Sequence, residues 1–327
     1  MSQSSLDAVH SDPTGSGPAE PPRGAALGRV DVGTLRRALD ARRCAWEVGS
    51  RLALLLLVLG IATTSPWYVQ VPALVVIGVL QYHMLVLSHE AQHYLIARRR
   101  RLNDLIGAWC LAYPFGQPFR SERARHLAHH KLVGHPEDPD FHRYVLEDKR
   151  PWLGLIGYFV RLATYGKLLE YLSSAARRSP GGDPQPSLNR RSSSELLTVG
   201  LVQLGVLVGF ALFASWTYYP FLWLLPLLVV TTPLSEFREF CEHVSAPGTP
   251  LHLKSFRVGV LPRFVIAPVG FSYHAEHHFY PSIPHYRLPE VAAEFPESTD
   301  SLEVHHSYFD VVRKCRAGLA APVAPCA

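Results

Sequence analysis

Charged residues are scarce in this sequence, and their scarcity limits what kind of protein it can encode. Asp, Glu, Lys and Arg make up 18% of the 327 residues, whereas 48% are hydrophobic. Soluble domains usually contain roughly one quarter charged residues, so this composition argues against an ordinary soluble domain and favours a membrane protein. The net charge of +5 has the sign that membrane proteins carry in their cytoplasmic loops.

Paired cysteines are lacking as well. The cysteines number five, an odd count, and no two of them form a Cys-x-x-Cys motif. Their spacing therefore predicts neither a disulfide framework nor a zinc site built from thiolates. We expect reduced thiols in a cytosolic setting at all five positions, which are Cys44, Cys110, Cys241, Cys315 and Cys326.

Two long stretches contain no charged residue at all, 52–88 and 196–235. One membrane-spanning helix needs about 20 apolar residues, so each stretch has room for nearly two. Pro66 and Pro220 supply a turn signal near the middle of each stretch. We therefore expect two transmembrane helical hairpins, over about 45–88 and 196–235, which together make four spans.

The remaining segments complete a predicted all-α integral membrane fold with interfacial helices and a cytosolic, histidine-rich helical cap. Three apolar runs are too short or too interrupted to span, so interfacial or re-entrant helices are expected there. These runs are 105–119, 151–166 and 258–273. The predicted divisions are a disordered cytosolic tail at 1–29, a membrane domain at 30–295 with a flexible linker at 179–195, and a cytosolic C-terminal segment at 296–327.

The predicted topology can be oriented by its arginines. Two hairpins return the chain to the side from which it started, so every segment outside the two short turns lies on one side of the membrane. The arginine-rich segments, among them 98–101 and 120–125, fall on that side. Since Lys and Arg are concentrated in cytoplasmic loops, we expect both termini and the histidine clusters on the cytoplasmic face of a bacterial cell membrane.

Histidine is the residue type that stands out among those present, with 17 copies. Nine of them form one HxxxH motif, two HxxHH motifs and a single residue after the second hairpin. Residues at i, i+3 and i+4 share one face of a helix, so each motif directs its imidazoles toward one place. The nine candidate metal ligands are His89, His93, His126, His129, His130, His243, His274, His277 and His278.

Each motif alone has a simpler explanation as a polar surface patch, but two HxxHH copies in one membrane protein are difficult to explain in that way. The first motif also matches the HExxH signature of zinc metalloproteases, in which Glu90 would be the general base. One tetrahedral zinc takes three or four ligands, so this alternative leaves most of the histidines without a role. A metal transporter or a haem-binding protein is a further alternative. Transport needs polar residues near the middle of the membrane, and only His83 lies well inside a predicted span, so the sequence gives this alternative little support.

Nine nitrogen ligands suit two metal ions with four to five ligands each, which leaves open positions for O2. Nitrogen ligation without thiolates is compatible with iron, copper or zinc. Carboxylates beside metal-bound histidines commonly accept the second ring N–H and fix the tautomer. Among the carboxylates that adjoin the nine histidines, we predict such a catalytic-site role above all for Asp140 and Glu276. The others are Glu90, Asp138, Glu239 and Glu242.

The order of these motifs resembles that of the membrane fatty acid desaturase/hydroxylase superfamily. The resemblance is carried by HEAQHYLIARRRRLNDLIG, RARHLAHH with its DPD loop, REFCEH and YHAEHHFYPSIPHYRLP, and it extends from about Trp46 to Leu288. It implies a histidine-box, non-haem di-iron integral membrane oxidoreductase, in which the nine histidines bind two Fe ions and O2 is a co-substrate. His135 departs from the pattern, because relatives more often have a small polar residue there, and it is expected to be a non-ligand histidine.

The resemblance also implies a lipid-like substrate and a membrane lipid environment. Desaturation of a fatty acyl chain, as an acyl-lipid or acyl thioester, is the expected reaction, and hydroxylation or ketolation of a lipid, carotenoid or specialised metabolite is the alternative. The HPGG motif of a fused cytochrome b5 domain is missing, because the His135-Pro136 pair is followed by Glu137. Electrons are therefore expected from a separate ferredoxin- or rubredoxin-type donor with its reductase. No nucleic-acid partner is expected.

Overall fold

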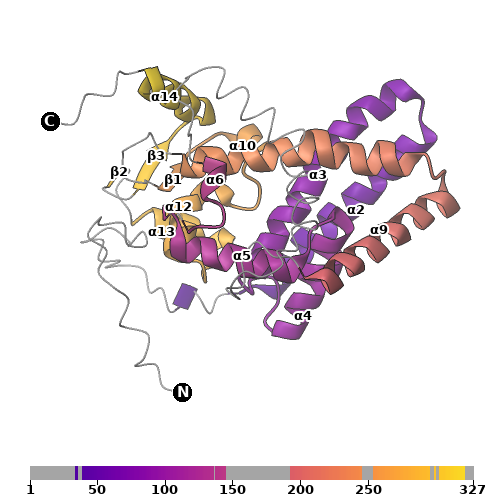
Figure 1. The fold of residues 1–327 in the computed structure, drawn as a ribbon, viewed down its shortest axis with the longest axis horizontal. Helices are drawn as coiled ribbons and strands as arrows, with labels where there is room; N and C mark the ends of the chain where they lie inside the picture. The colour runs from indigo at the N-terminus through magenta and orange to yellow at the C-terminus, as the bar shows by residue number, and fades with distance from the viewer. Residues whose placement is uncertain are drawn as a thin grey trace, which may run out of the picture.

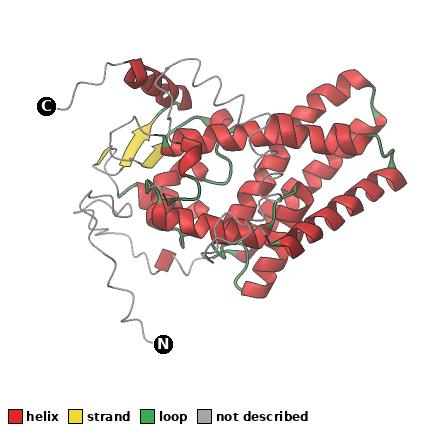
Figure 2. Cartoon of the chain, in the orientation of Figure 1, coloured by secondary structure: helices red, strands yellow, loops and turns green. Residues whose placement is uncertain are grey.

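The computed structural model describes residues 34–35, 39–135, 137–144, 192–244, 253–294, 298–299 and 302–320. Helices dominate this part of the chain, with one small sheet at the edge (Figure 2). The predicted tail at 1–29, the apolar run at 151–166 and most of the predicted linker at 179–195 lie outside the described residues.

Four helical segments are long and apolar enough to cross a membrane, which agrees with the four predicted spans. They are α2 (Ala41–Thr64), α3 (Trp67–Gln92), α9 (Ser193–Phe213) and a segment over Tyr219–His243. The last consists of two π-helical stretches, η5 (Tyr219–Leu224) and η6 (Leu227–Thr231), followed by α10 (Thr232–His243). Because α9 begins at Ser193, the end of the predicted linker is helical and not a loop.

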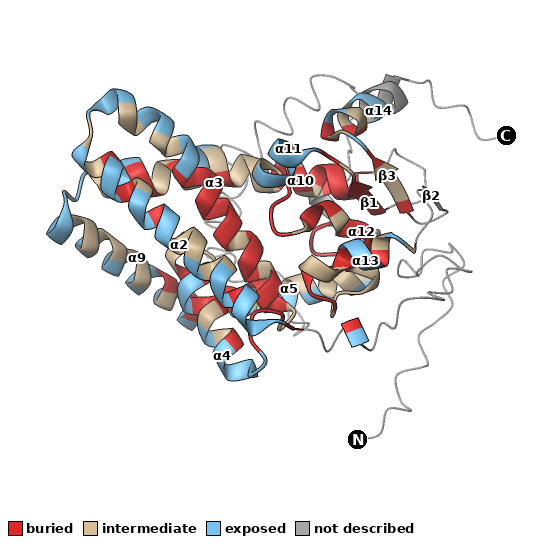
Figure 3. Ribbon diagram, turned by 180° about the vertical axis from the view of Figure 1, so that it is seen from behind, coloured by how far each residue is buried: buried red, intermediate tan, exposed pale blue. Residues whose placement is uncertain are grey.

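The four segments are buried to very different degrees. The apolar window of α3 is 61% buried within the protein, whereas that of α9 is only 6% buried. Figure 3 shows α3 largely buried and α9 at the outside. Side chains such as Leu201, Leu204 and Leu212 on α9 are exposed, and a bilayer is the solvent in which such a surface is stable.

Close contact between α3 and η6 depends on a glycine. A Cβ added at Gly78 would lie 2.4 Å from the Cβ of Val230, so a larger residue would push the two helices apart. Thr231 Oγ1 donates a hydrogen bond of 2.8 Å to the Gly78 carbonyl at this contact. Gln81 Nε2 donates to the Trp223 carbonyl at 3.0 Å, which gives a partner to a backbone group in the π-helical stretch.

The segment that follows α3 was predicted as one interfacial or re-entrant helix over 105–119. In the structure it consists of several short pieces, because Pro114 and a turn at Gly116 with φ of 78° interrupt it. The pieces are α4 (Arg100–Leu105), the π-helix η2 (Ile106–Ala112), the 3-10 turn η3 (Tyr113–Phe115) and α5 (Phe119–Leu132).

A cap of short elements packs at one end of the long helices (Figure 1). Its helices are α6 (Phe141–Tyr144), α11 (Val260–Val265), η7 (Phe271–Tyr273), α12 (His274–Phe279), η8 (His285–Arg287), α13 (Leu288–Ala292) and α14 (Tyr308–Ala320). The helix predicted over 258–273 is thus only partly helical, since Pro268, Val269 and Gly270 separate α11 from η7.

The prediction of an all-α fold was wrong in one respect, because the cap contains a three-stranded sheet. Its order is β1-β3-β2, with β1 (Leu253–Phe256) parallel to β3 (Leu302–His305) and β3 antiparallel to β2 (Ser298–Thr299). Strands of two to four residues are too short for an alternating pattern to be recognised. The segment predicted to be a separate C-terminal part, 296–327, therefore contributes a strand that is hydrogen-bonded to the membrane domain.

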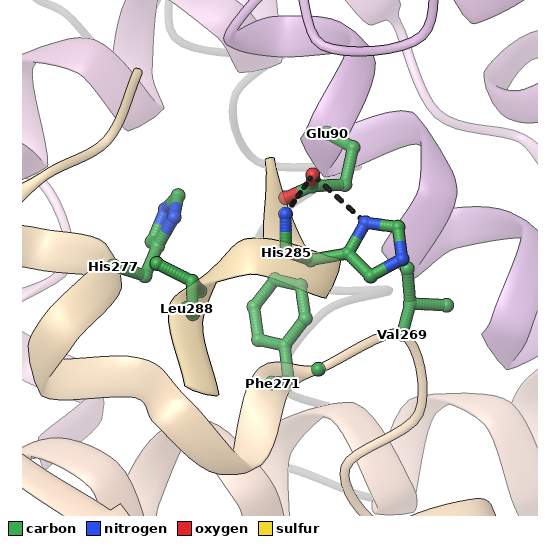
Figure 4. A pocket seen from close by; sticks show the side chains of 7 residues that line it. Glu90, Val269, Phe271, His277, His285 and Leu288 are labelled. Carbon is green, nitrogen blue, oxygen red and sulfur yellow. Dashed lines mark hydrogen bonds and ion pairs between the residues drawn. The ribbon is translucent and has the colours of Figure 1, made fainter. Parts of the chain in front are cut away.

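His285 connects the cap to both helices of the first predicted hairpin, and Figure 4 shows its contacts with Glu90 of α3. Its Nε2 lies 3.0 Å from Glu47 Oε2 on α2, and its Nδ1 lies 3.1 Å from Glu90 Oε2 on α3. The backbone N–H of His285 also donates to Glu90, at 3.2 Å. Burial alone would lower the pKa of His285, but the two carboxylates raise it to about 9. His285 is therefore an imidazolium at neutral pH, paired with two carboxylates.

We predict that this contact makes the stability of the fold depend on alkaline pH. The pKa of His285 rises from an ordinary 6.5 to about 9, so its contribution is fully present below about pH 6.5 and is lost as the pH rises through 9. Thermal unfolding of the purified protein, followed from about pH 6 to about pH 10, should show the melting temperature falling over this range. The His285→Gln variant should be less stable at neutral pH and should lose most of the slope. The matched change at the exposed His306 should leave the slope as it is, and an equal slope in His285→Gln would contradict the assignment.

Candidate metal centre

The structure brings all nine predicted ligand histidines to one place, where the long helices meet the cap. They come from the C-terminal end of α3, the last turns of α5, the last residue of α10, and α12. Their ring nitrogens fall into two neighbouring groups. The rings of His130 and His278 stack at 4.2 Å between centroids where the groups adjoin.

The first group contains five histidines. One ring nitrogen of each lies within 4.8 Å of the others. The closest pairs are His93 and His126, whose Nε2 atoms are 2.7 Å apart, and His126 and His130, at 2.9 Å. His277 Nε2 is buried and has no hydrogen-bond partner among the described residues. The members of this group are His89, His93, His126, His130 and His277.

The second group contains four histidines centred on His243. Its Nε2 lies 3.1 Å from that of His129, 3.0 Å from that of His274 and 3.3 Å from that of His278. Each HxxHH motif is divided between the groups. The i, i+4 pair of α5 belongs to the first group and His129 to the second, whereas the i, i+4 pair of α12 belongs to the second group and His277 to the first.

The geometry of the donors fits metal ions. Two nitrogens that each lie about 2.1 Å from one ion, at right angles, are about 3.0 Å apart, which is the spacing seen between the paired Nε2 atoms. Burial and the neighbouring histidines hold the pKa values of most ligand rings on α5 and α12 well below the ordinary value. These rings are therefore neutral at pH 7, which is the form of imidazole that binds metals.

Asp138 orients the ring of His129. Its two carboxylate oxygens lie 2.9 and 3.0 Å from His129 Nδ1, and Tyr144 donates its hydroxyl hydrogen to the same carboxylate. Burial would raise the pKa of Asp138, but the hydrogen bonds from His129 and Tyr144 lower it, so the group is a carboxylate. An Nδ1–H bonded to Asp138 leaves Nε2 of His129 free to bind an ion.

Contacts on α10 orient His243 and His274 of the second group. Glu242 Oε2 lies 3.3 Å from His274 Nδ1 and 3.5 Å from an Arg238 nitrogen. The His243 ring donates from Nδ1 to the backbone carbonyl of Glu239 at 3.1 Å. Arg238 also lies 4.1 Å above the ring of Phe271, which in turn packs edge-on against His89 at 4.5 Å. Sequence reasoning gave no role to Arg238, although it begins the REFCEH motif, or to Tyr144, which lies outside the histidine motifs.

Of the two carboxylates predicted to act at the site, Asp140 lies beside it and Glu276 does not. Asp140 is bound by Arg125 and stays 4.0 Å from His129 Nδ1. Glu276 is buried against β1, where it accepts hydrogen bonds from Ser255 and, at 2.7 Å, from Arg257. On a helix, residues one or two positions apart do not face the same way, so Glu276 points away from the ligand histidines of its own motif. That signal against Glu276 was present in the sequence, whereas the contacts of Asp138 and Glu242 with ligand histidines are seen only in the structure.

Glu90 and His135 can also be placed. Glu90 lies 4.0 Å from His89 Nδ1 and is bonded to His285 instead, so its contacts are those of a structural link and not of a general base. His135 belongs to neither group of ring nitrogens among the described residues, as expected for a non-ligand histidine. The metalloprotease alternative therefore gains no support from the geometry.

Comparison with known proteins agrees with the resemblance seen in the sequence. Residues 65–309 match the family model described as Fatty acid desaturase. The chain is 25% identical over 241 residues to the dihydrorhizobitoxine desaturase of Bradyrhizobium elkanii, which covers 68% of this chain and 66% of that protein.

Two further relatives are named for different reactions. A beta-carotene ketolase of Paracoccus sp. (strain N81106 / MBIC 01143) is 25% identical over 64% of this chain and 74% of its own length. An sn-1 acyl-lipid omega-3 desaturase (ferredoxin) of Nostoc sp. (strain 36) is 26% identical over 64% of this chain and 63% of its own. The chain thus spans about two thirds of the length of these relatives. Since the family match covers well over half of the chain and includes all nine candidate ligand histidines, the chain belongs to the fatty acid desaturase family.

Proposed function

We propose that this protein is an O2-dependent, non-haem di-iron oxidoreductase that desaturates a fatty acyl chain, carried as an acyl-lipid or an acyl thioester. The observation that carries the proposal is the set of nine histidines in two adjoining groups of five and four nitrogens. Family membership and two relatives named as desaturases support the reaction type.

The chemistry of the donors admits iron, copper or zinc, and membership of the desaturase family favours iron among them. Neutral imidazoles without thiolates suit a divalent first-row ion, and four or five ligands leave positions open on each. Two iron ions held by these histidines would supply the activation of O2 and the removal of hydrogen from an unactivated C–H bond.

The protein's own part is to hold the ligand rings in one protonation state and one orientation. Asp138 keeps the proton of His129 on Nδ1, and the Glu239 carbonyl does the same for His243. Glu242, balanced by Arg238, stands beside His274. These contacts are buried, so water does not compete for them, and a ring that is fixed before metal binding loses little freedom on binding.

We propose that the four apolar segments form two transmembrane hairpins, with the histidines and both termini on the cytoplasmic side. Both connections between paired helices lie at the end of the bundle away from α5 and α12 (Figure 1). Trp67 and Trp216 are exposed at these connections, where aromatic side chains commonly mark a membrane interface. Exposed arginines such as Arg99 and Arg101 lie at the opposite end, as in a cytoplasmic face of a bacterial cell membrane.

Electrons would come from a separate ferredoxin- or rubredoxin-type protein with its reductase. One relative carries ferredoxin in its name. The exposed arginines before α4 would attract an acidic donor, since complementary charge speeds association. Hydroxylation or ketolation is the second candidate, because another relative is named as a beta-carotene ketolase.

The proposal is tested by expressing the full chain in a host together with a ferredoxin and its reductase. The metal content is measured on the protein purified from the membrane, and the products are measured in the lipids of the host. We expect about two irons per chain and an O2-dependent change in the host lipids. A new double bond supports desaturation, and a new hydroxyl or keto group supports the second candidate. One zinc per chain, with no O2-dependent product, would overturn both.

Replacing one ligand histidine should separate ligands from bystanders. In His129→Ala we expect bound iron to fall from about two toward about one per chain, and product formation to fall roughly 100-fold or more, because a group of four nitrogens is reduced to three. His135→Ala removes a nearby histidine outside both groups and should keep iron and activity. Iron analysis and lipid profiling of the two variants decide the matter, and full iron content in His129→Ala would contradict the assignment.

Asp138→Asn should weaken the second group selectively. The change removes the charge that holds the His129 proton on Nδ1, so we expect about 10- to 100-fold weaker iron binding at that group, with the first group retained. Glu137→Gln is the matched control, because it removes the same charge from an exposed position in the same loop. Chelator titration resolves the two sites, and equal weakening of both would argue against the role of Asp138.

A further inference from the structure

Glu195 is a buried carboxylate far from the ligand histidines, in the first turn of α9. The sequence placed it at the end of a flexible linker. Its side chain is 6% exposed, and no described Lys or Arg forms an ion pair with it. A buried charge without a cation is costly unless hydrogen-bond donors surround it.

Four donors surround this carboxylate, and all come from the segment formed by η3 and the first turn of α5. The backbone N–H groups of Arg120 and Ser121 donate to it at 2.6 and 3.0 Å. The Ser121 hydroxyl donates at 2.7 Å and the Tyr113 hydroxyl at 3.1 Å. Both carboxylate oxygens are engaged, so Glu195 fixes its position against this segment firmly.

The two backbone N–H groups lie in the first turn of α5, where a helix has no acceptor of its own for them and needs a cap. Helix α5 begins after Pro118, which occupies the N-cap position and has no side chain that can accept a hydrogen bond. An N-cap side chain normally accepts from the second or third N–H of its helix, and in α5 these belong to Arg120 and Ser121. Glu195 supplies the missing cap from another helix, and its charge also suits the positive end of the α5 dipole.

The capped helix carries ligands of both metal groups. His126 and His130 belong to the first group and His129 to the second. A rotation of α5 about its axis, or a shift along it, would displace all three rings. A contact that fixes the start of α5 therefore acts on both groups at once, in contrast to Asp138, which contacts one ring of one group.

We propose that Glu195 is a positioning residue of the metal centre, which caps α5 from α9 and so fixes the ligand helix for both ions. The inference rests on the proposed function only where it takes the metal to be iron. The comparison of metal binding between variants does not depend on which metal is bound. Glu195 touches no ligand histidine, and its effect is transmitted through the α5 backbone.

The test compares metal binding by variants of the full chain in detergent or nanodiscs. In Glu195→Ala we expect about 10- to 100-fold weaker binding at both groups, measured by metal content after dialysis against a graded chelator series. The Mössbauer signals of both iron sites should broaden or shift together. This joint effect distinguishes Glu195 from Asp138, whose loss should affect one site.

A second change tests the capping itself. Pro118→Asp, made in the Glu195→Ala background, gives α5 an N-cap of its own, because the backbone at Pro118 already has the extended conformation of a cap residue. We expect this double variant to recover most of the lost metal affinity. Loss of folding in Glu195→Ala that Pro118→Asp reverses would support the proposal equally.

Gln203→Leu is the control for general loosening of α9. Gln203 donates to the Tyr113 and Pro114 carbonyls at 2.9 and 2.8 Å, so it joins α9 to the same segment without touching the start of α5. The proposal would be overturned if Glu195→Ala bound metal as tightly as the wild type, or if Gln203→Leu weakened metal binding as much as Glu195→Ala does. It would also be overturned if Pro118→Asp did not restore metal binding in the Glu195→Ala background. If the wild type binds a metal other than iron, the proposed function fails while the comparison between variants still decides the role of Glu195.

Discussion

Imidazole nitrogens that are buried and turned toward one another are the constraint on which the rest of this structure depends. Such nitrogens repel one another when no proton or ion lies between them, and burial removes the water that would relieve them. Several helices end at this point. The last turns of α3, α5 and α10 carry ligand histidines, so the partial negative charge at helix C-termini faces the place where cations would bind.

Holding these helix ends together requires polar contacts inside an otherwise apolar bundle. His285 pairs with a carboxylate on each of α2 and α3, and Glu195 joins α9 to α5. Gln81 and Thr231 satisfy backbone groups where α3 meets the π-helical stretches. In a bilayer every backbone polar group must find a partner within the protein, so these side chains set both the register and the spacing of the helices.

The sequence predicted the long helices well and singled out the nine histidines that the structure brings together, because both depend on short-range patterns. Charge-free runs mark spans, and the i, i+3, i+4 spacing of histidines is recorded directly in the chain. What it did not predict depends on contacts between distant segments. The choice of Asp138 over Asp140 depends on how a loop folds, and the sheet pairs 253–256 with 302–305. Glu195 looked like part of a polar linker because its donors lie about 75 residues earlier in the sequence.

The exchange of histidines between the two HxxHH motifs has a consequence for the order of events during synthesis. The N-terminal half of the chain carries four of the five ligands of the first group, and the C-terminal half carries three of the four ligands of the second. The N-terminal half contributes His129 to the second group, and the C-terminal half contributes His277 to the first. Since a chain emerges from its N-terminus, neither group of histidines is complete until α12 has been made, and the proposed metal loading would thereby be tied to the final stage of assembly.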